Sequence, residues 1–153
     1  MKVYRIFRRQ WVPAPLEVVF AFFDRPENLN EITPPSLHFR ILTPSPVPMH
    51  QGALIDYSIR LMGIPMRWTS YIAVYEPPRC FVDVQLRGPY SFWHHTHRFQ
   101  AVNGGTEITD EVLYALPFGI LGRVIHTLLV WRQLEYIFDY RSQRIQERFG
   151  ATE

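Results

Sequence analysis

The sequence predicts an α+β protein in which a strongly curved antiparallel sheet wraps around one long C-terminal helix. The helix is expected from Pro117 to Phe149, because proline suits a first helical turn and Gly150 suits the position just past the end. The sheet is expected between Leu37 and Ala115, where apolar and polar residues alternate between short turns of glycine and proline. Such short turns cannot hold crossovers, so consecutive strands must be antiparallel.

Size and composition favour one domain spanning residues 1–153. A chain of 153 residues can bury a core and enclose a cavity within it. Hydrophobic residues make up 47% and charged residues 20%, which excludes a disordered chain. Aromatic residues make up 15%, a share that predicts a pocket lined by rings in addition to an ordinary core.

The net charge and the cysteine content limit the possible binding partners and the cellular compartment. The net charge of +2, with a pI of about 8.9, is too weakly basic to predict nucleic-acid binding. Cys80 is the only cysteine, which rules out an intramolecular disulfide and fits the cytoplasm. The start of the chain lacks the apolar core of a signal peptide. No apolar run approaches the ~18 residues of a membrane span, so we expect no integral membrane contact.

The remaining elements follow from apolar spacing and from turn residues. Val3–Val12 reads as the first strand, and two short helices are expected at Leu16–Phe23 and Pro26–Ile32. The segment Thr43–Gln51 contains three prolines and reads as a stiff, exposed loop. Six further strands are expected, at Leu37–Leu42, Ala53–Met62, Met66–Tyr75, Cys80–Arg87, Phe92–Val102 and Thr106–Leu116.

The long helix carries more apolar surface than one face needs. At 100° per residue one line follows its whole length: Ile120, Val124, Trp131, Leu134, Phe138, Ile145 and Phe149. A second face exists in the first half only: Phe118, Leu121, Ile125, Leu128 and Leu129. This face is expected either to be covered by the sheet and the short helices, or to serve as a homodimer contact or a mobile gate over the pocket. His126 falls on the polar side and is expected at the surface.

Four stretches resemble the START/SRPBCC superfamily, which includes polyketide cyclase/dehydrase-like proteins, lipid-transfer proteins and birch-pollen-allergen-like plant proteins. The stretches are Pro13–Phe23, Pro26–Leu29, Gly88–Phe99 and Gly104–Gly119. Within the superfamily the chain is most similar to bacterial ligand-binding SRPBCC proteins. The resemblance implies the helix-grip fold, a seven-stranded antiparallel sheet with two short helices and a long C-terminal helix that enclose a cavity. It does not imply one chemistry, because binders, transfer proteins, cyclases and isomerases share this scaffold.

Three polar residues are expected to point into the interior. The period of two in Phe92–Val102 places His95 and His97 on the same face as Trp93 and Phe99. In the next strand Asp110 shares a face with apolar residues. The three could form a buried hydrogen-bond network, orient a polar group of a ligand, act in proton transfer, or hold a metal. We find no nucleophile, phosphate-loop or dinucleotide motif and expect no cofactor and no metal.

The function expected is binding or carriage of a small hydrophobic ligand, lipid-like, aromatic or polycyclic. One alternative is a cofactor-independent cyclase, dehydratase or isomerase that uses His95 or His97 with Asp110 or Asp83, and another is a regulatory interaction module. Asp83 and Gln85 join the pocket only if Phe81 points inward, which we favour although Val82 and Val84 make the opposite face more apolar. The residues expected to line the site are Tyr57, Trp68, Asp83, Gln85, Trp93, His95, His97, Phe99, Asp110, Tyr114, Leu121, Val124, Ile125 and Leu128.

Overall fold

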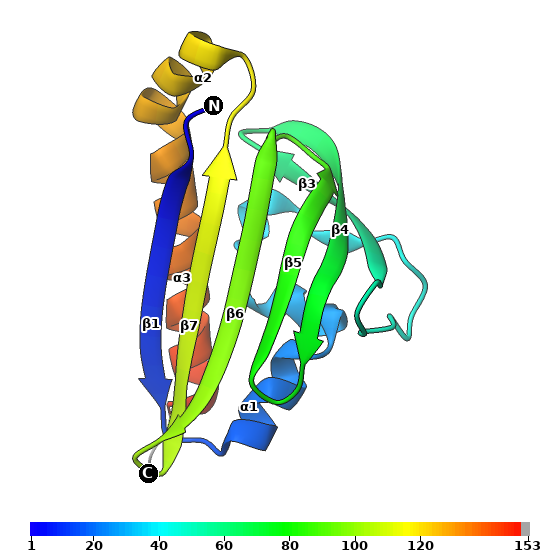
Figure 1. Ribbon diagram of the computed structural model, residues 1–153, viewed down its shortest axis with the longest axis vertical. Coiled ribbons are helices and arrows are strands. Elements are labelled where there is room, and N and C mark those ends of the chain that lie inside the picture. Colours follow the sequence, from blue (N-terminus) through cyan, green and yellow to red (C-terminus); the bar gives the residue numbers. More distant parts are fainter. Residues whose placement is uncertain (151–153) are drawn as a thin grey trace.

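The computed structural model describes residues 1–150 and contains a seven-stranded antiparallel sheet and a long C-terminal helix (Figure 1). The strands are β1 (Tyr4–Val12), β2 (Arg40–Ile41), β3 (Leu54–Leu61), β4 (Ile64–Glu76), β5 (Cys80–Arg87), β6 (Phe92–Val102) and β7 (Gly105–Ala115). The helices are α1 (Leu16–Phe23), the 3₁₀ helices η1 (Pro26–Ile32) and η2 (Pro35–Leu37), α2 (Gly119–Ile125), the π-helical turn η3 (His126–Val130) and α3 (Trp131–Phe149).

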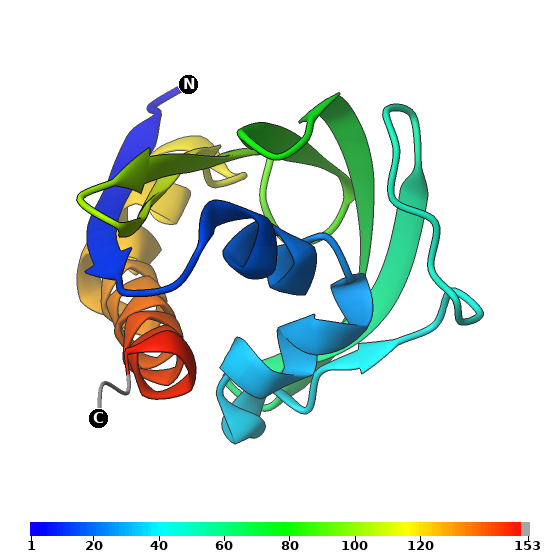
Figure 2. The ribbon, with the colours of Figure 1, turned by 90° about the horizontal axis from the view of Figure 1, so that it is seen from below.

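The sheet runs in the order β1-β7-β6-β5-β4-β3-β2, with every neighbouring pair antiparallel. It curves around α3 on its concave side, and α1 lies across its lower opening (Figure 2). The helix-grip architecture expected from the sequence is confirmed. Because β1 pairs with β7, the first strand closes the side of the sheet next to the terminal helix.

The expected strands are found with shifted ends, and the largest shift is at β2. The sequence predicts a strand at Leu37–Leu42, whereas the structure has only Arg40–Ile41 in β2. The cause is local, since Pro35 begins a 3₁₀ turn and His38 adopts a left-handed conformation with φ of 48°. The turn between β6 and β7 likewise needs positive φ at Asn103 and Gly104, as its Asn-Gly-Gly sequence predicts.

The terminal helix differs from the expected single α-helix in two ways. It begins at Gly119, because Phe118 has a φ of 71° that no α-helix accepts. It also contains the π-helical turn His126–Val130, in which the backbone N–H of Trp131 bonds to the carbonyl of His126. The extra residue in this turn changes the phase of the apolar pattern between α2 and α3.

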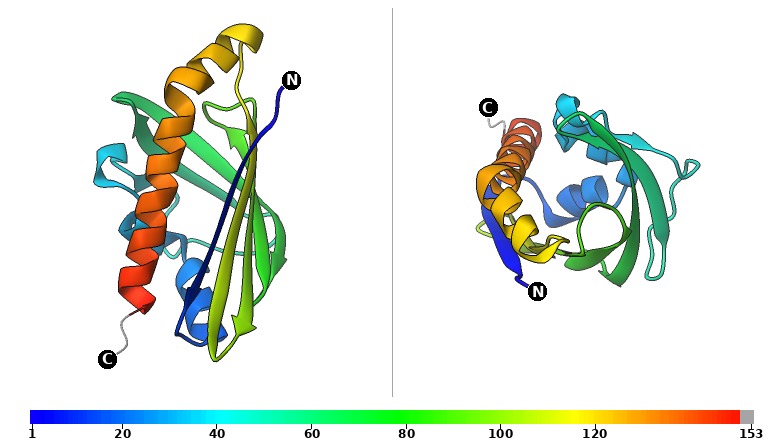
Figure 3. Two further views of the ribbon diagram at one scale, coloured as in Figure 1. Left: turned by 90° about the vertical axis from the view of Figure 1, so that its left-hand side faces the viewer. Right: turned by 90° about the horizontal axis from the view of Figure 1, so that it is seen from above.

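The expected apolar line divides into a buried part and an exposed part. In α3, Leu134, Phe138 and Ile145 are buried as predicted. Before the turn, Ile120 is 76% exposed and Val124 is 48% exposed, so the prediction of one continuous buried line is wrong. Figure 3 shows the physical reason, because α2 projects beyond the end of the sheet and has no strand beneath it.

Two large apolar clusters fill most of the space between the sheet and the helices, and a smaller third one lies beside them. The upper one is rich in large aromatic residues and contains Trp68, Tyr90, Trp93, Tyr114, Leu134 and Phe138. The lower one is rich in phenylalanine and contains Phe20, Phe22, Phe23, Phe81, Phe99 and Ile145. No helix among residues 1–150 combines the length and the apolarity that crossing a membrane requires.

Candidate functional site

A cavity of about 160 Å³ lies between the concave face of the sheet and α3. A smaller cavity of about 60 Å³ adjoins it towards α1. Both share the same wall in the middle of the molecule: Leu29, Tyr57, Asp83, His97 and Arg141. Leu29 of η1, Thr33 directly after it and Ile137 of α3 are only half-buried. The larger cavity therefore approaches the surface between these two elements.

Aromatic rings form the apolar wall of the larger cavity. The rings of Trp68 and Trp93 meet edge to face at 5.2 Å between centroids, and Tyr90 packs on both. Tyr57 stacks on Trp68 at 6.0 Å. The indole N–H of Trp68 is buried and has no hydrogen-bond partner within residues 1–150. An unpaired buried donor is costly, so this indole is an exception among the buried polar side chains of residues 1–150.

A polar cluster interrupts this apolar wall at the boundary between the two core clusters. His95 Nε2 lies 2.8 Å from Asp110 Oδ1, and His97 Nε2 lies 2.6 Å from Asp83 Oδ2. From α3, Arg141 donates to both oxygens of Asp110, each at 3.2 Å. The two imidazoles stack on each other with 3.6 Å between their centroids. Strands β5, β6 and β7 and helix α3 together supply the five residues of this polar cluster.

The hydrogen bonds assign the proton positions of both imidazoles. A carboxylate only accepts, so each Nε2 carries a proton and donates it to Asp110 or Asp83. The Nδ1 of His97 accepts from Arg141 at 3.4 Å, which leaves neither nitrogen of that ring free. The Nδ1 of His95 has no hydrogen-bond partner within residues 1–150, and its nearest carboxylate oxygen, on Asp83, is 4.0 Å away. His95 is therefore the residue of the cluster with an available lone pair beside the cavity.

Burial and charge set the protonation states of the cluster. Burial lowers the pKa of His97 to about 4, and the nearby His95 adds to this shift, so His97 is neutral at pH 7. Burial alone would raise the pKa of Asp110, but the Arg141 guanidinium and the His95 hydrogen bond outweigh it and hold the pKa well below its usual range. Burial is likewise outweighed at Asp83, whose pKa is lowered by the hydrogen bond from His97.

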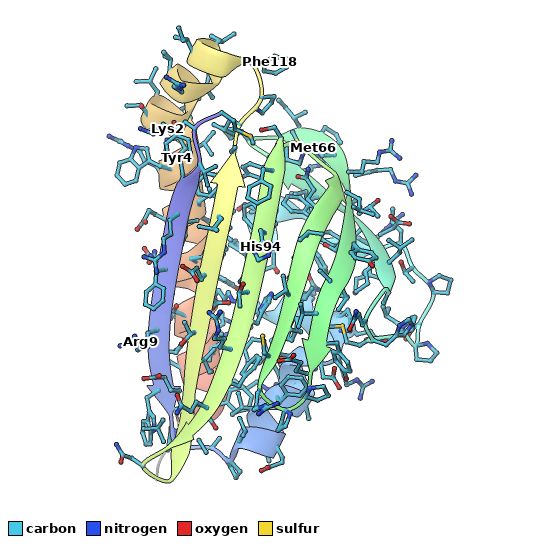
Figure 4. All side chains as sticks on the ribbon, in the orientation of Figure 1. Lys2, Tyr4, Arg9, Met66, His94 and Phe118 are labelled. Carbon is cyan, nitrogen blue, oxygen red and sulfur yellow. The ribbon has the colours of Figure 1, made fainter. Side chains whose placement is uncertain are left out.

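The structure places six of the residues expected to line the site in the cavity wall: Tyr57, Trp68, Asp83, Trp93, His95 and His97. Phe81 and Asp83 point inward, the orientation favoured from the sequence. Figure 4 labels His94 on the opposite, convex face of the sheet. Alternation along β6 therefore separates His95 and His97 from His94.

Four other predicted residues lie behind the wall or in the turns instead of lining it. Asp110 sits behind the imidazoles and pairs with Arg141. Gln85 bonds to both backbone polar groups of Tyr90. Phe99 packs in the lower core cluster, and Tyr114 is hydrogen-bonded to His126 at 2.7 Å.

The predicted residues of the helix start do not reach the cavity in residues 1–150. Leu121 and Leu128 are more than 60% exposed and Val124 is 48% exposed. Ile125 is half-buried and packs against the upper core cluster. The physical reason is the projection of α2 beyond the sheet. Coverage of this face by the sheet and the short helices, one of the expectations, is therefore wrong.

Sequence reasoning missed Arg141 and misplaced His126. The run of arginines near the end of the helix indicates a solvated face, yet Arg141 is only 7% exposed. Its spacing carried the signal, because it lies three residues after Phe138 and four before Ile145, on the buried face of α3. His126 is 9% exposed and stacks on Tyr4 at 3.5 Å, because the π-helical turn directs it inward.

Asp83, His95 and His97 offer a set of atoms that could surround a metal ion, all within 4.8 Å of one another. The proton positions oppose this use. A metal at Nε2 of His97 would force the ring proton onto Nδ1, where it would face the N–H of Arg141. The Arg141 charge also disfavours a dication at this place. The residues present suit a polar group of an organic ligand better than a metal.

A sequence model of the family described as "Polyketide cyclase / dehydrase and lipid transport" matches residues 12–130. None of the curated proteins compared with the chain matches it.

Solved structures share the fold at low sequence identity. A protein from Thermus thermophilus is 17% identical with a TM-score of 0.70, covering 95% of this chain and 96% of that one. A Chromobacterium violaceum protein is 12% identical with a TM-score of 0.73, covering 97% and 99%. Ginseng major latex-like protein 151 from Panax ginseng is 9% identical with a TM-score of 0.69, covering 96% and 97%.

Replacing Arg141 by methionine should destabilise the fold by about 3–5 kcal/mol, because Asp110 would be left as a buried, unpaired charge. The double variant Asp110→Asn/Arg141→Met should recover much of this loss. Arg144→Met, which removes a half-exposed arginine one turn further along, should cost at most about 1 kcal/mol. Denaturant unfolding at pH 7 measures all three, and equal losses for Arg141→Met and Arg144→Met would contradict the role of the pair.

The stability of the protein should fall as the pH drops below about 6.5, the pKa of histidine in an unfolded chain. His97 has a folded pKa of about 4, so the unfolded state binds its proton first and the free energy of unfolding decreases between these values. The slope is about 1.4 kcal/mol per pH unit. The carboxylates of Asp83 and Asp110, whose folded pKa values are lowered, add to the loss below about pH 4.

His97→Gln should flatten the decline between pH 6.5 and 4, whereas His94→Gln on the convex face should keep the wild-type profile. Denaturant titrations across this pH range give the comparison. A His97→Gln profile identical to wild type would show that another group is responsible.

Proposed function

We propose that this chain, which belongs to the polyketide cyclase/dehydrase and lipid transport family, binds or carries a small ring-containing hydrophobic molecule in the cavity between the sheet and α3. The observation that carries the proposal is an aromatic cavity with one polar cluster in its wall. Ligand sites commonly combine apolar walls with a few placed polar groups. The family description and the fold of the similar structures support hydrophobic ligand binding in general.

The volume of the cavity supports a ligand of about one ring. A buried apolar cavity of about 150 Å³ accommodates benzene, whereas pockets for drug-sized molecules measure ~300–1,000 Å³. The larger cavity here is about 160 Å³. A single aromatic ring fits this space directly, and a polycyclic or long-chain ligand requires the 3₁₀ segment and α3 to move apart.

One group in the wall supports a ligand with a hydroxyl. The free Nδ1 of His95 can accept a hydrogen bond from a ligand hydroxyl. Asp110 accepts the Nε2 proton of His95 and so keeps the ring in the tautomer whose Nδ1 carries no proton. The ligand we propose is therefore a hydrophobic ring that carries one polar group, like a phenol.

We also propose a compartment and a possible partner for the protein. The single Cys80 supports action in a reducing compartment such as the cytoplasm. A homodimer through the first half of the C-terminal helix also stays a proposal, since the apolar side chains there are exposed. The sign of the charge around those side chains determines whether a second copy of the chain or a different partner binds that surface more favourably.

A second function, proton transfer at a carbon next to a carbonyl, is favoured by the geometry of His95. Its Nε2–H is held by Asp110 at 2.8 Å and its Nδ1 is free, the arrangement in which a histidine acts as a base. Asp110 stabilises the imidazolium that forms. His97 is less suitable, because both of its nitrogens are engaged. Cyclases, dehydratases and isomerases that need no cofactor use such a step.

Filling the cavity should abolish ligand binding without unfolding the protein. Ile59→Phe adds a ring to the cavity wall, and Ile64→Phe adds the same ring at an exposed position as the matched control. NMR titration with phenol and toluene, which share a shape, should show binding to wild type and to Ile64→Phe and loss in Ile59→Phe. Phenol should bind more tightly than toluene, and His95→Gln should reduce that preference by about 1 kcal/mol. Identical titrations of Ile59→Phe and wild type would rule out this cavity.

Catalysis at His95 should accelerate hydrogen exchange in a bound cyclic ketone. Cyclohexanone in D₂O exchanges the protons next to its carbonyl, and NMR follows the rate. Wild-type protein should increase this rate by about 10²-fold or more, the usual contribution of a placed general base, and His95→Gln should remove the increase. If cyclohexanone binds but exchanges no faster than in buffer, the enzyme alternative is excluded while ligand binding stands.

A further inference from the structure

Apolar side chains gather on the surface of the first half of the terminal helix. We call this surface the exposed helix face, defined by Phe118, Ile120, Leu121, Val124, Leu128 and Leu129. Phe118 and Ile120 are 77% and 76% exposed, and the other four are between 48% and 63% exposed. Figure 3 shows that this part of the helix stands clear of the sheet. Six large apolar residues within twelve positions exceed the scattered exposure normal for a surface.

The charge around the exposed helix face has one sign. Residues 117–134 include Arg123 and Arg132 but no aspartate or glutamate. The first carboxylate beyond them, on Glu135, is already held by Arg8 at 3.0 Å. Among the ion pairs within residues 1–150, none involves Lys2, Arg123 or Arg132. These cations are free to meet negative charge on a partner.

A basic cavity adjoins the exposed helix face at its base. Its volume is about 300 Å³, and Lys2, Arg123 and Ser91 contribute to its wall. Figure 4 shows Lys2 and Phe118 at the same end of the molecule, beside α2. Lys2, Arg123 and the hydroxyl of Ser91 are groups that bind phosphate oxygens. The apolar surface and the anion-binding groups therefore lie next to each other.

The terminal helix is anchored at the π-helical turn, beside the exposed helix face. His126 at its start is anchored by stacking on Tyr4 and by the hydrogen bond to Tyr114. Trp131, just after the turn, is 42% exposed, and its indole N–H bonds to the Thr127 carbonyl. Tryptophan beside an arginine-containing apolar face is typical of helices that lie in the interface of a bilayer.

We propose that the exposed helix face binds the surface of an anionic lipid bilayer, with its apolar side chains among the acyl chains and with Lys2 and Arg123 at lipid phosphates. A second copy of the chain is a poorer partner. Two-fold pairing of this face would bring the same cations together, and residues 117–134 supply no carboxylate to pair with them. The anionic bilayer supplies both an apolar interior and negative charge. This inference goes beyond the proposed function and does not depend on it.

Co-sedimentation of the whole protein with vesicles tests the proposal. Wild type should bind vesicles of phosphatidylcholine mixed with phosphatidylglycerol at least tenfold more strongly than vesicles of phosphatidylcholine alone, and salt should weaken the binding. Leu121→Ser/Leu128→Ser should lower binding by tenfold or more, and Arg123→Glu should do the same. Leu54→Ser, at an exposed site on β3, and Arg79→Glu, in the turn before β5, are the matched controls and should bind as wild type does.

Three results would overturn the proposal. The first is wild-type binding no stronger to the anionic vesicles than to the neutral ones. The second is unchanged binding by the Leu121→Ser/Leu128→Ser and Arg123→Glu variants. The third is a wild-type dimer in sedimentation velocity that Leu121→Ser/Leu128→Ser converts to a monomer, which would assign the face to a second copy.

Discussion

The arrangement of the interior depends on the ion pair between Asp110 and Arg141. Both residues are buried, and each would be a costly charge without the other. The pair joins the middle of β7 to the middle of α3, so it sets how the helix lies along the sheet. It also orients both imidazoles, since Asp110 accepts from His95 and Arg141 donates to His97. The same ion pair therefore stabilises the fold and orients the side chains of the site.

Much of the fold was predictable because its signals are local. Alternation placed the strands, and short turns of Asn, Gly and Pro made their order antiparallel. The ends of β2 and of the terminal helix were not predictable in this way, because left-handed backbone at His38 and Phe118 moves them. Neither histidine nor phenylalanine requires a left-handed conformation, so the sequence held no signal for these two ends. The exposed apolar residues of α2 were also ambiguous, since sequence does not show where a sheet ends.

The alternation of inward and outward side chains along the strands predicted part of the site. It placed His95 and His97 in the interior and left the orientation of Asp83 ambiguous, and the structure brings the three together. It could not supply Arg141, because that residue comes from a distant element and an arginine reads as solvated unless a buried carboxylate faces it. Nor could it tell the two histidines apart. Arg141 alone distinguishes them, by occupying Nδ1 of His97 and leaving Nδ1 of His95 free.

The π-helical turn at His126–Val130 has a consequence for how the chain can vary in length. A π-helical turn holds one residue more than the α-helical turn it replaces. Deleting a single residue there would restore an ordinary α-helix and leave α2 and α3 pointing as they do now. Insertions or deletions elsewhere in the helix would rotate one half against the other by about 100° per residue. Related chains that differ by one residue at this turn can therefore keep both helix faces, and a sequence alignment should place its gap there.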